Sequence, residues 1–304
     1  MTEGSTSGSE IAAQDPILYA ALQDLARSAR AVFFAGLPGT GKSLLVHQLV
    51  RLTHATQRPA HLLQWDVVRP AIERSPAAAA YPKVDGVTHP AVRIAAGLWA
   101  RDMIAQWAGR SFPPEHILIG ETPLVGHRFI ELARVAADEA ERFLSAAACR
   151  FVIPVPSVEV RRAIEGERGR RIKRPVHDRE KEDAPPNVLR AQWEALAEVA
   201  PLIGARPLIP SPGGTESAPG ALSRRYDPDV YERVYRFVLR RRHAQSVPLR
   251  MLLPAAATSA YDYGVPMREL VPTPDEAAAF IRLVEARFPD PRAAHAAADE
   301  WYVV

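Results

Sequence analysis

The chain has 304 residues, of which 47% are hydrophobic and 24% are charged, and its formal net charge is +3. This composition supports a buried core and excludes a chain that is disordered as a whole. The single cysteine, Cys149, excludes a disulfide framework and a cysteine-rich zinc site, and no apolar run approaches the ~18 residues of a membrane span.

The first residues contain neither a basic segment nor an apolar one, so they predict no secretory signal, and we expect a cytoplasmic protein. Residues 1–14, rich in Gly and Ser, are expected to form a flexible tail. Asp15 followed by Pro16 predicts a helix that begins there and ends near Ser28. The apolar run 31–35 predicts a buried strand that stops at Gly36.

Further strands and helices alternate along the chain. Short apolar runs predict strands over 61–65, 116–119 and 151–155, and helical periodicity predicts helices over 43–52, 67–75, 90–106 and 128–146. This alternation predicts an α/β fold in which a parallel sheet carries helices on both faces.

The second half begins with a strongly basic segment. Residues 161–174 hold seven basic and two acidic side chains. Beyond it we expect a helix over 187–199, a Pro/Gly-rich loop over 201–225, a helix over 227–242, a fifth strand over 249–253 and a helix over 273–288. The predicted organisation is a core over 15–200 with a lid at about 160–183, the loop 201–225, and a C-terminal part over 226–304 that completes the sheet and adds helices.

One segment matches a phosphate-binding motif at every fixed position, G-x-x-x-x-G-K-[ST]. It consists of Gly36, Leu37, Pro38, Gly39, Thr40, Gly41, Lys42 and Ser43. An apolar strand precedes it and an amphipathic helix follows it, which is the context that this motif requires. The glycines allow the backbone amides to converge on phosphate, Lys42 would reach the β- and γ-phosphates, and Ser43 would offer a hydroxyl to Mg²⁺. The segment therefore predicts a nucleoside triphosphate site.

Polar residues follow the second and third predicted strands. In open parallel sheets ligands bind at the carboxyl ends of the strands, so Asp66, Arg69 and Glu121 are candidate site residues. We expect the second strand near the first, which would bring Asp66 within reach of an attacking hydroxyl as a general base. The alternatives are a helix cap for Asp66, a structural carboxylate for Glu121 instead of a magnesium-water or substrate ligand, and a solvated helix face for Arg69 instead of an anion clamp.

Together, the phosphate motif, Asp66 and the Arg-rich stretch from Val160 to Arg174 make residues 31–200 resemble the P-loop kinases of the adenylate-kinase-like group. The resemblance is strongest to the zeta-toxin, gluconate kinase and shikimate kinase branch, with polynucleotide kinase further away. It implies a P-loop fold with a five-stranded parallel sheet, an aspartate after the second strand that accepts the hydroxyl proton, and a mobile Arg-rich lid. The chain departs from this pattern because Glu121 stands where an aspartate is common.

The basic segment predicts a second part of the catalytic apparatus. Arginine forks stabilise the negative charge of a transferred phosphoryl group, and Arg168 and Arg171 are the candidates. The alternative is a solvated charged helix.

These observations favour an ATP-dependent phosphotransferase that uses Mg²⁺ and moves the γ-phosphoryl group to a hydroxyl of a small-molecule acceptor. The first alternative is a P-loop ATPase that acts as a regulatory or partner-binding switch. The second is a polynucleotide end kinase, for which the basic stretches are the only support, so nucleic acid is possible as a partner but not favoured. No membrane partner is expected, and the sequence leaves the acceptor and the oligomeric state open.

Overall fold

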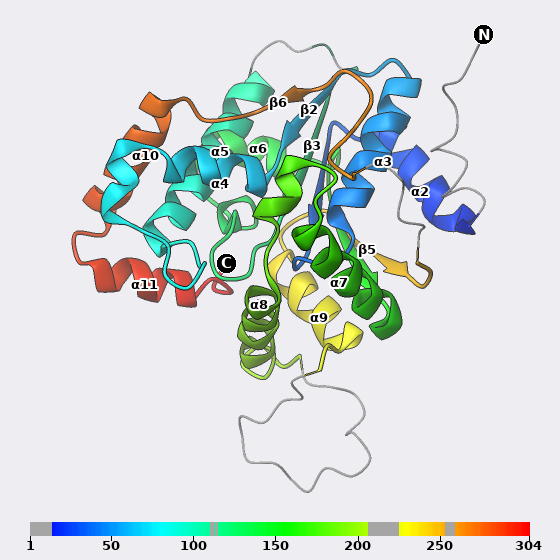
Figure 1. Cartoon of the computed structure of the whole chain (residues 1–304). Coiled ribbons are helices and arrows are strands. Elements are labelled where there is room, and N and C mark those ends of the chain that lie inside the picture. The colour runs from blue at the N-terminus through cyan, green and yellow to red at the C-terminus, as the bar shows by residue number, and fades with distance from the viewer. Residues whose placement is uncertain (1–13, 110–112, 114, 206–224, 253–258) are drawn as a thin grey trace, which may run out of the picture.

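The computed structural model describes residues 14–109, 113, 115–205, 225–252 and 259–304. Residues 1–13 of the expected tail and 206–224 of the expected loop lie outside this part. The centre of the fold is one open sheet of parallel strands (Figure 1), in the spatial order β5 (Ala244–Leu249), β4 (Cys149–Pro156), β1 (Ala31–Ala35), β3 (Ile117–Thr122), β2 (Ala60–Leu63) and β6 (Arg268–Glu269).

The predicted α/β class and the parallel sheet are confirmed, whereas the sheet has six strands instead of the predicted five. The extra strand, β6, is two residues long and pairs with β2, and so short a segment carries no periodic pattern. The fifth strand, β5, begins five residues before the predicted 249–253. It is an edge strand in which only Leu249 is buried, and it includes Pro248, which an edge strand tolerates.

Helices cover both faces of the sheet, and this explains why the central strand β1 is apolar at every position. Val32 and Phe34 pack with α2 (Pro16–Ser28) and α3 (Lys42–Ala55), while Phe33 packs with helices of the opposite layer. That layer includes α4 (Trp65–Glu73), α5 (Pro90–Gly109), α6 (Glu139–Leu144), α8 (Pro186–Val199), α9 (Pro228–Val238), α10 (Pro274–Arg287) and α11 (Pro291–Asp299). Figure 1 shows α2 and α3 on one side of the sheet and α5, α10 and α11 on the other.

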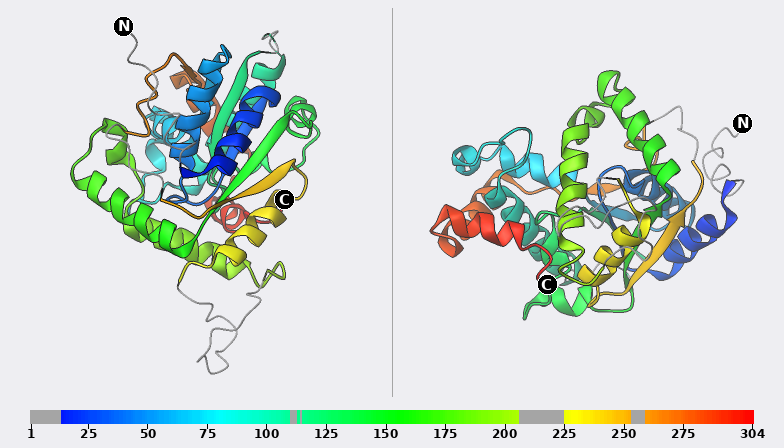
Figure 2. Two further views of the ribbon diagram at one scale, coloured as in Figure 1. Left: turned by 90° about the vertical axis from the view of Figure 1, so that its right-hand side faces the viewer. Right: turned by 90° about the horizontal axis from the view of Figure 1, so that it is seen from below.

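The Arg-rich segment forms helix α7 (Val158–Lys173), which is joined to α8 through the short 3-10 helix η3 (Asp178–Glu182). Helices α7 and α8 meet in a V across the end of the sheet (Figure 2). Two shorter 3-10 helices, η1 (Pro76–Ala80) and η2 (Ile130–Leu132), complete the fold.

The helix predicted over 128–146 is mostly absent. Only η2 and the six-residue α6 form there, and the left-handed backbone of Phe129 interrupts any helix that begins at residue 128. The apolar side chains that suggested helical periodicity pack instead into the core from this loop. Within the described residues, no helix has the length and apolar character needed to span a bilayer.

Candidate functional site

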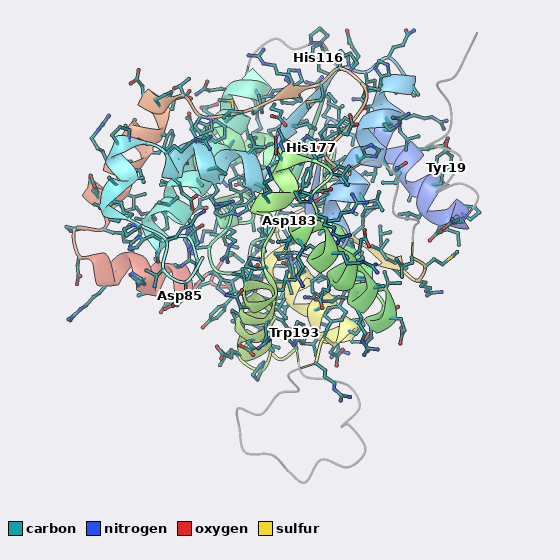
Figure 3. The ribbon with its side chains drawn as sticks, viewed as in Figure 1. Tyr19, Asp85, His116, His177, Asp183 and Trp193 are labelled. Atoms are coloured by element: carbon teal, nitrogen blue, oxygen red, sulfur yellow. The ribbon has the colours of Figure 1, made fainter. Side chains whose placement is uncertain are left out.

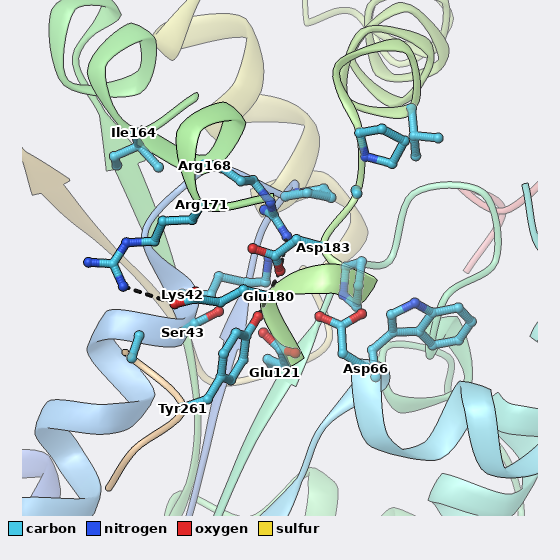
Figure 4. A pocket seen from close by; sticks show the side chains of 18 of the residues that line it. Lys42, Ser43, Asp66, Glu121, Ile164, Arg168, Arg171, Glu180, Asp183 and Tyr261 are labelled. Atoms are coloured by element: carbon cyan, nitrogen blue, oxygen red, sulfur yellow. Dashed lines mark hydrogen bonds and ion pairs between the residues drawn. The ribbon is translucent and has the colours of Figure 1, made fainter. Parts of the chain in front are cut away.

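A cavity of about 410 Å³ lies at the carboxyl ends of β1, β2 and β3 (Figure 4). The glycine-rich loop after β1, the start of α4, the end of β3, helix α7, η3 and residues 259–261 contribute to its walls. The segment between α4 and α5 contributes Lys83, Gly86 and Thr88.

The glycine-rich loop is closely packed at its first residue, Gly36, where there is no space for a side chain. A Cβ atom on Gly36 would lie 2.5 Å from the Tyr231 hydroxyl oxygen and 2.6 Å from Thr40 Oγ1. Farther along, Gly39 and Gly41 have φ angles of 78° and 85°, which glycine adopts without steric cost. Gly39 and Gly41 line the cavity together with Pro38, while Leu37 and Thr40 are buried behind the loop.

The loop leads into the N-terminus of α3, whose first residues are Lys42 and Ser43. The N-cap residue is Gly41, so no side chain satisfies the amides of the first turn, whereas α2, α7, α9 and α10 all have side-chain caps. A helix N-terminus with unsatisfied amides and a positive dipole end attracts anions. Both Lys42 and Ser43 line the cavity.

Lys42 is a buried ammonium group with 7% of its surface exposed. Its Nζ donates a hydrogen bond to the Leu37 carbonyl oxygen over 3.0 Å, and it has no ion pair within the described part of the chain. Burial lowers the pKa of Lys42, and the nearby Glu121 carboxylate opposes that shift. The cation is therefore held in place by a neutral carbonyl and is available to an anionic ligand.

Five carboxylates line the cavity. Glu167 and Glu180 come from α7 and η3, and the other three are Asp66 on α4, Glu121 on β3 and Asp183 just after η3. Burial and the Asp66 charge raise the pKa of Glu121 to about 7, and burial also raises the pKa of Asp183. Glu121 pairs in register with Phe34, the penultimate residue of β1. It therefore lies at the end of the sheet where the glycine-rich loop follows β1.

Asp66 lies in the first turn of α4, but the N-cap of that helix is Gln64, so the helix-cap alternative for Asp66 is wrong. Its carboxylate accepts no hydrogen bond from any of the residues that the structure describes, and it faces the cavity (Figure 4). The second strand, β2, lies near β1 in the sheet, separated from it by β3. Asp66 nevertheless reaches the cavity because α4 begins directly after β2 at its carboxyl end.

The Arg-rich helix α7 directs Arg168 and Arg171 into the cavity, as the sequence predicts. Arg168 forms an ion pair with Asp183 over 2.6 Å, and Arg171 forms one with Glu180 over 2.9 Å. The alternative of a fully solvated helix is wrong for these two arginines, whose side chains are only 15% and 18% exposed. Asp183 itself lies near the centre of the molecule (Figure 3).

Residues 259–261 were not predicted as site residues, yet they support these ion pairs. The Tyr261 hydroxyl donates to Asp183 Oδ1 over 2.8 Å, and the Ser259 hydroxyl donates to Glu180 Oε1 over 2.7 Å. Their separation from η3 by almost 80 residues explains why the sequence carried no local signal for them.

Arg69 lines the cavity and is buried, so the solvated alternative is wrong here too. It pairs with Glu73 over 2.8 Å, and Glu73 also binds Lys83 and the Thr88 hydroxyl. His127, beyond Glu121 in the sequence, is buried against Glu131 and does not line the cavity.

Ser43 is the candidate hydroxyl ligand for Mg²⁺ next to Asp66 and Glu121. Three or more His, Cys, Asp or Glu residues do not gather into a metal-binding group anywhere in the described ranges. The Ser43 hydroxyl together with phosphate oxygens is a donor set that would suit Mg²⁺. Comparison of the chain with protein-family models, with curated proteins and with solved structures gave no match.

Proposed function

We propose that the protein is a P-loop kinase, which transfers the γ-phosphoryl group of ATP to a hydroxyl of a small-molecule acceptor. The observation that carries this proposal is the convergence, in one cavity, of the uncapped N-terminus of α3, the buried Lys42 and the Asp66 carboxylate, which has no hydrogen-bond partner among the described residues. The first two features suit a polyphosphate, and the third suits proton removal from an attacking hydroxyl.

In this proposal the loop 36–43 binds the β- and γ-phosphates, and Lys42 exchanges the Leu37 carbonyl for phosphate oxygens. Ser43 and the phosphates would hold Mg²⁺, which neutralises charge on the phosphates when it is bound. Asp66 accepts the proton of the acceptor hydroxyl, and Arg168 and Arg171 stabilise the charge that spreads over the transferred group.

The size of the cavity favours a small acceptor over a polynucleotide end. At about 410 Å³ it lies within the range of pockets that enclose small ligands. The basic side chains in it are mostly paired with carboxylates, so they do not form an open cationic track of the kind that binds single-stranded nucleic acid.

The experiment is a phosphotransfer screen with radiolabelled ATP against polyols, sugars, hydroxy acids, nucleosides and oligonucleotides, together with calorimetry of ATP binding. We expect Lys42→Ala to abolish ATP binding. Asp66→Asn should retain ATP binding but lower acceptor phosphorylation by about 10²–10⁴-fold, because only the base is lost. Asp178→Asn, an exposed aspartate, is the matched control.

Two results would count against the kinase. Hydrolysis of ATP that needs no acceptor and survives Asp66→Asn would favour the ATPase switch. Failure of the wild-type protein to bind ATP would remove the nucleotide site itself.

A further inference from the structure

The cations that line the cavity divide into two groups according to their partners. Five of the seven form ion pairs with carboxylates: Arg69 and Lys83 with Glu73, Arg168 with Asp183, Arg171 with Glu180 and Lys181 with Asp178. Among the residues that the structure describes, Lys42 and Arg128 have no carboxylate partner. The proposed function assigns the nucleotide phosphates to Lys42, and it leaves Arg128 without a role.

Arg128 is a buried guanidinium group with 8% of its surface exposed. Its Nη1 donates one hydrogen bond, to the Val125 carbonyl oxygen over 2.7 Å. Burial, and next the charge of Arg93, lower the pKa of Arg128 to about 9, so the group still carries its charge at neutral pH. Buried charges in proteins are ordinarily paired, and this one faces an open cavity instead.

The loop that carries Arg128 has an unfavourable backbone. Leu124, His127 and Phe129 have φ angles of 61°, 65° and 61°, in the left-handed region that non-glycine residues adopt only at an energetic cost. Reciprocal backbone hydrogen bonds of 2.8 and 3.1 Å join Leu124 and Arg128 across the turn. The conformation thus fixes the position of the guanidinium group before any ligand arrives.

Buried contacts hold this loop from behind. His127 lies 2.5 Å from Glu131 through Nε2 and 2.9 Å from the Ala297 carbonyl oxygen of α11 through Nδ1. The Arg93 side chain donates to the Gly126 carbonyl oxygen over 2.5 Å. These contacts over-determine the strained loop, which is typical of a binding site that is organised in advance.

The candidate base connects Arg128 to the nucleotide site. Asp66 lines the same cavity as Lys42 and Arg128. Its charge partly opposes the lowering of the pKa of both cations. We infer that Arg128 is an anion subsite for the acceptor, which carries a carboxylate or a phosphate group in addition to the hydroxyl that receives the phosphoryl group. This inference rests on the proposed function for the identity of the ligand as an acceptor.

The test uses three probes that share a glycerol-like skeleton: glycerol 3-phosphate, glycerate and the neutral glycerol. Calorimetry measures their binding to the full chain with and without a saturating non-hydrolysable ATP analogue and Mg²⁺. We expect one anionic probe to bind at least about tenfold more tightly than glycerol, a difference of about 1.4 kcal/mol. Which of the two anions binds distinguishes a phosphate from a carboxylate acceptor.

Arg128→Met should remove this discrimination while leaving the affinity for the ATP analogue unchanged. Arg128→Lys should keep part of it, because the charge remains while the bidentate geometry is lost. Equal binding of charged and neutral probes by the wild type, or unchanged anion binding by a folded Arg128→Met variant, would overturn the inference. So would anion binding that Lys42→Ala abolishes and the ATP analogue displaces, because that anion occupies the phosphate loop.

Two controls separate the possible failures. Thermal unfolding checks the variants, and Arg128→Met should raise Tm since it removes an uncompensated buried charge. If the wild type does not bind the ATP analogue, only the proposed function is contradicted. The titrations of the three probes without nucleotide still measure whether Arg128 binds an anion.

Discussion

Arg168 donates to the Asp183 carboxylate over 2.6 Å, and both side chains line the proposed phosphate site. The Asp183 carboxylate thus pairs with the guanidinium group that the transferred phosphoryl group would need in the proposed reaction. In the proposed reaction, ATP binding would require an exchange of partners, in which Arg168 leaves Asp183 for phosphate oxygens.

Asp183→Asn removes the negative charge that competes with phosphate for Arg168. We expect the variant to bind ATP about tenfold more tightly, or about 1.4 kcal/mol, and to unfold at a lower temperature because the buried Arg168 loses its counter-charge. Calorimetry and thermal unfolding measure the two effects, with Asp178→Asn as the exposed control. Weaker ATP binding by Asp183→Asn would instead mean that Asp183 positions Arg168 for its ligand.

Arg168→Ala tests the arginine itself. We expect kcat to fall on the order of 10³-fold at saturating ATP, because the charge that develops on the phosphoryl group loses a buried donor. Arg170→Ala is the matched control, since Arg170 lies on the same helix with its side chain 77% exposed. A decrease in kcat of similar size in both variants would mean that the loss comes from the charge or stability of the helix and not from the cavity.

The stability of the protein should depend on pH through Glu121. Its pKa is about 7 in the folded state against 4.5 ordinarily, so the folded protein retains a proton that the unfolded chain loses between these values. The carboxylate therefore destabilises the fold increasingly as pH rises, by up to about 3 kcal/mol above pH ~7. Glu121→Gln should stabilise the apo protein at about pH 8 and have an effect below about 1 kcal/mol at about pH 5.

Denaturant titrations of the wild type and of Glu121→Gln at these two pH values measure that difference. Titrating groups that do not interact with Glu121 contribute equally to both proteins, so the difference reports on Glu121 and on the charged groups beside it, chiefly Asp66 and Lys42. A gap between the proteins that stays constant from pH 5 to pH 8 would show that the carboxyl group does not titrate in this window.

Gly36 offers a steric prediction. A methyl group there would meet the Tyr231 hydroxyl at 2.5 Å, so Gly36→Ala should cost about 1–3 kcal/mol of unfolding free energy and weaken ATP binding. Adding Tyr231→Phe should restore part of the loss, while the contact with Thr40 at 2.6 Å keeps the rescue incomplete. Gly166→Ala, at a helical position with open space around it, should be neutral or stabilising.

The features that local sequence dictates were the ones that sequence could predict. The buried strand β1, the turn into α3 and the start of the helix predicted over 273–288 each depend on residues within a few positions of one another, and the structure has all three where they were expected. Edge strands gave weaker signals, because β5 is half-exposed and β6 is only two residues long.

Long-range contacts account for the remaining differences. The apolar residues near Phe129 imitate a helix, whereas contacts of His127 with α11 and of Arg93 with Gly126 hold the chain there in a strained loop. Arg168 and Arg171 stand out in the sequence because they belong to a cluster of basic residues. Their carboxylate partners, Asp183 and Glu180, and the hydroxyl of Tyr261 come from distant segments and have no such local signal.

The contacts of Ser259 and Tyr261 with Glu180 and Asp183 have a consequence for biosynthesis. A ribosome makes the chain from its N-terminus, so β1, the glycine-rich loop and helix α7 emerge long before residues 259–261. A nascent chain that has folded its central strands still lacks the hydroxyl groups that hold η3 against α7. The cavity therefore takes its final shape late in synthesis, after β5 has emerged. Until then, helix α7 and η3 lack the hydrogen bonds from Ser259 and Tyr261.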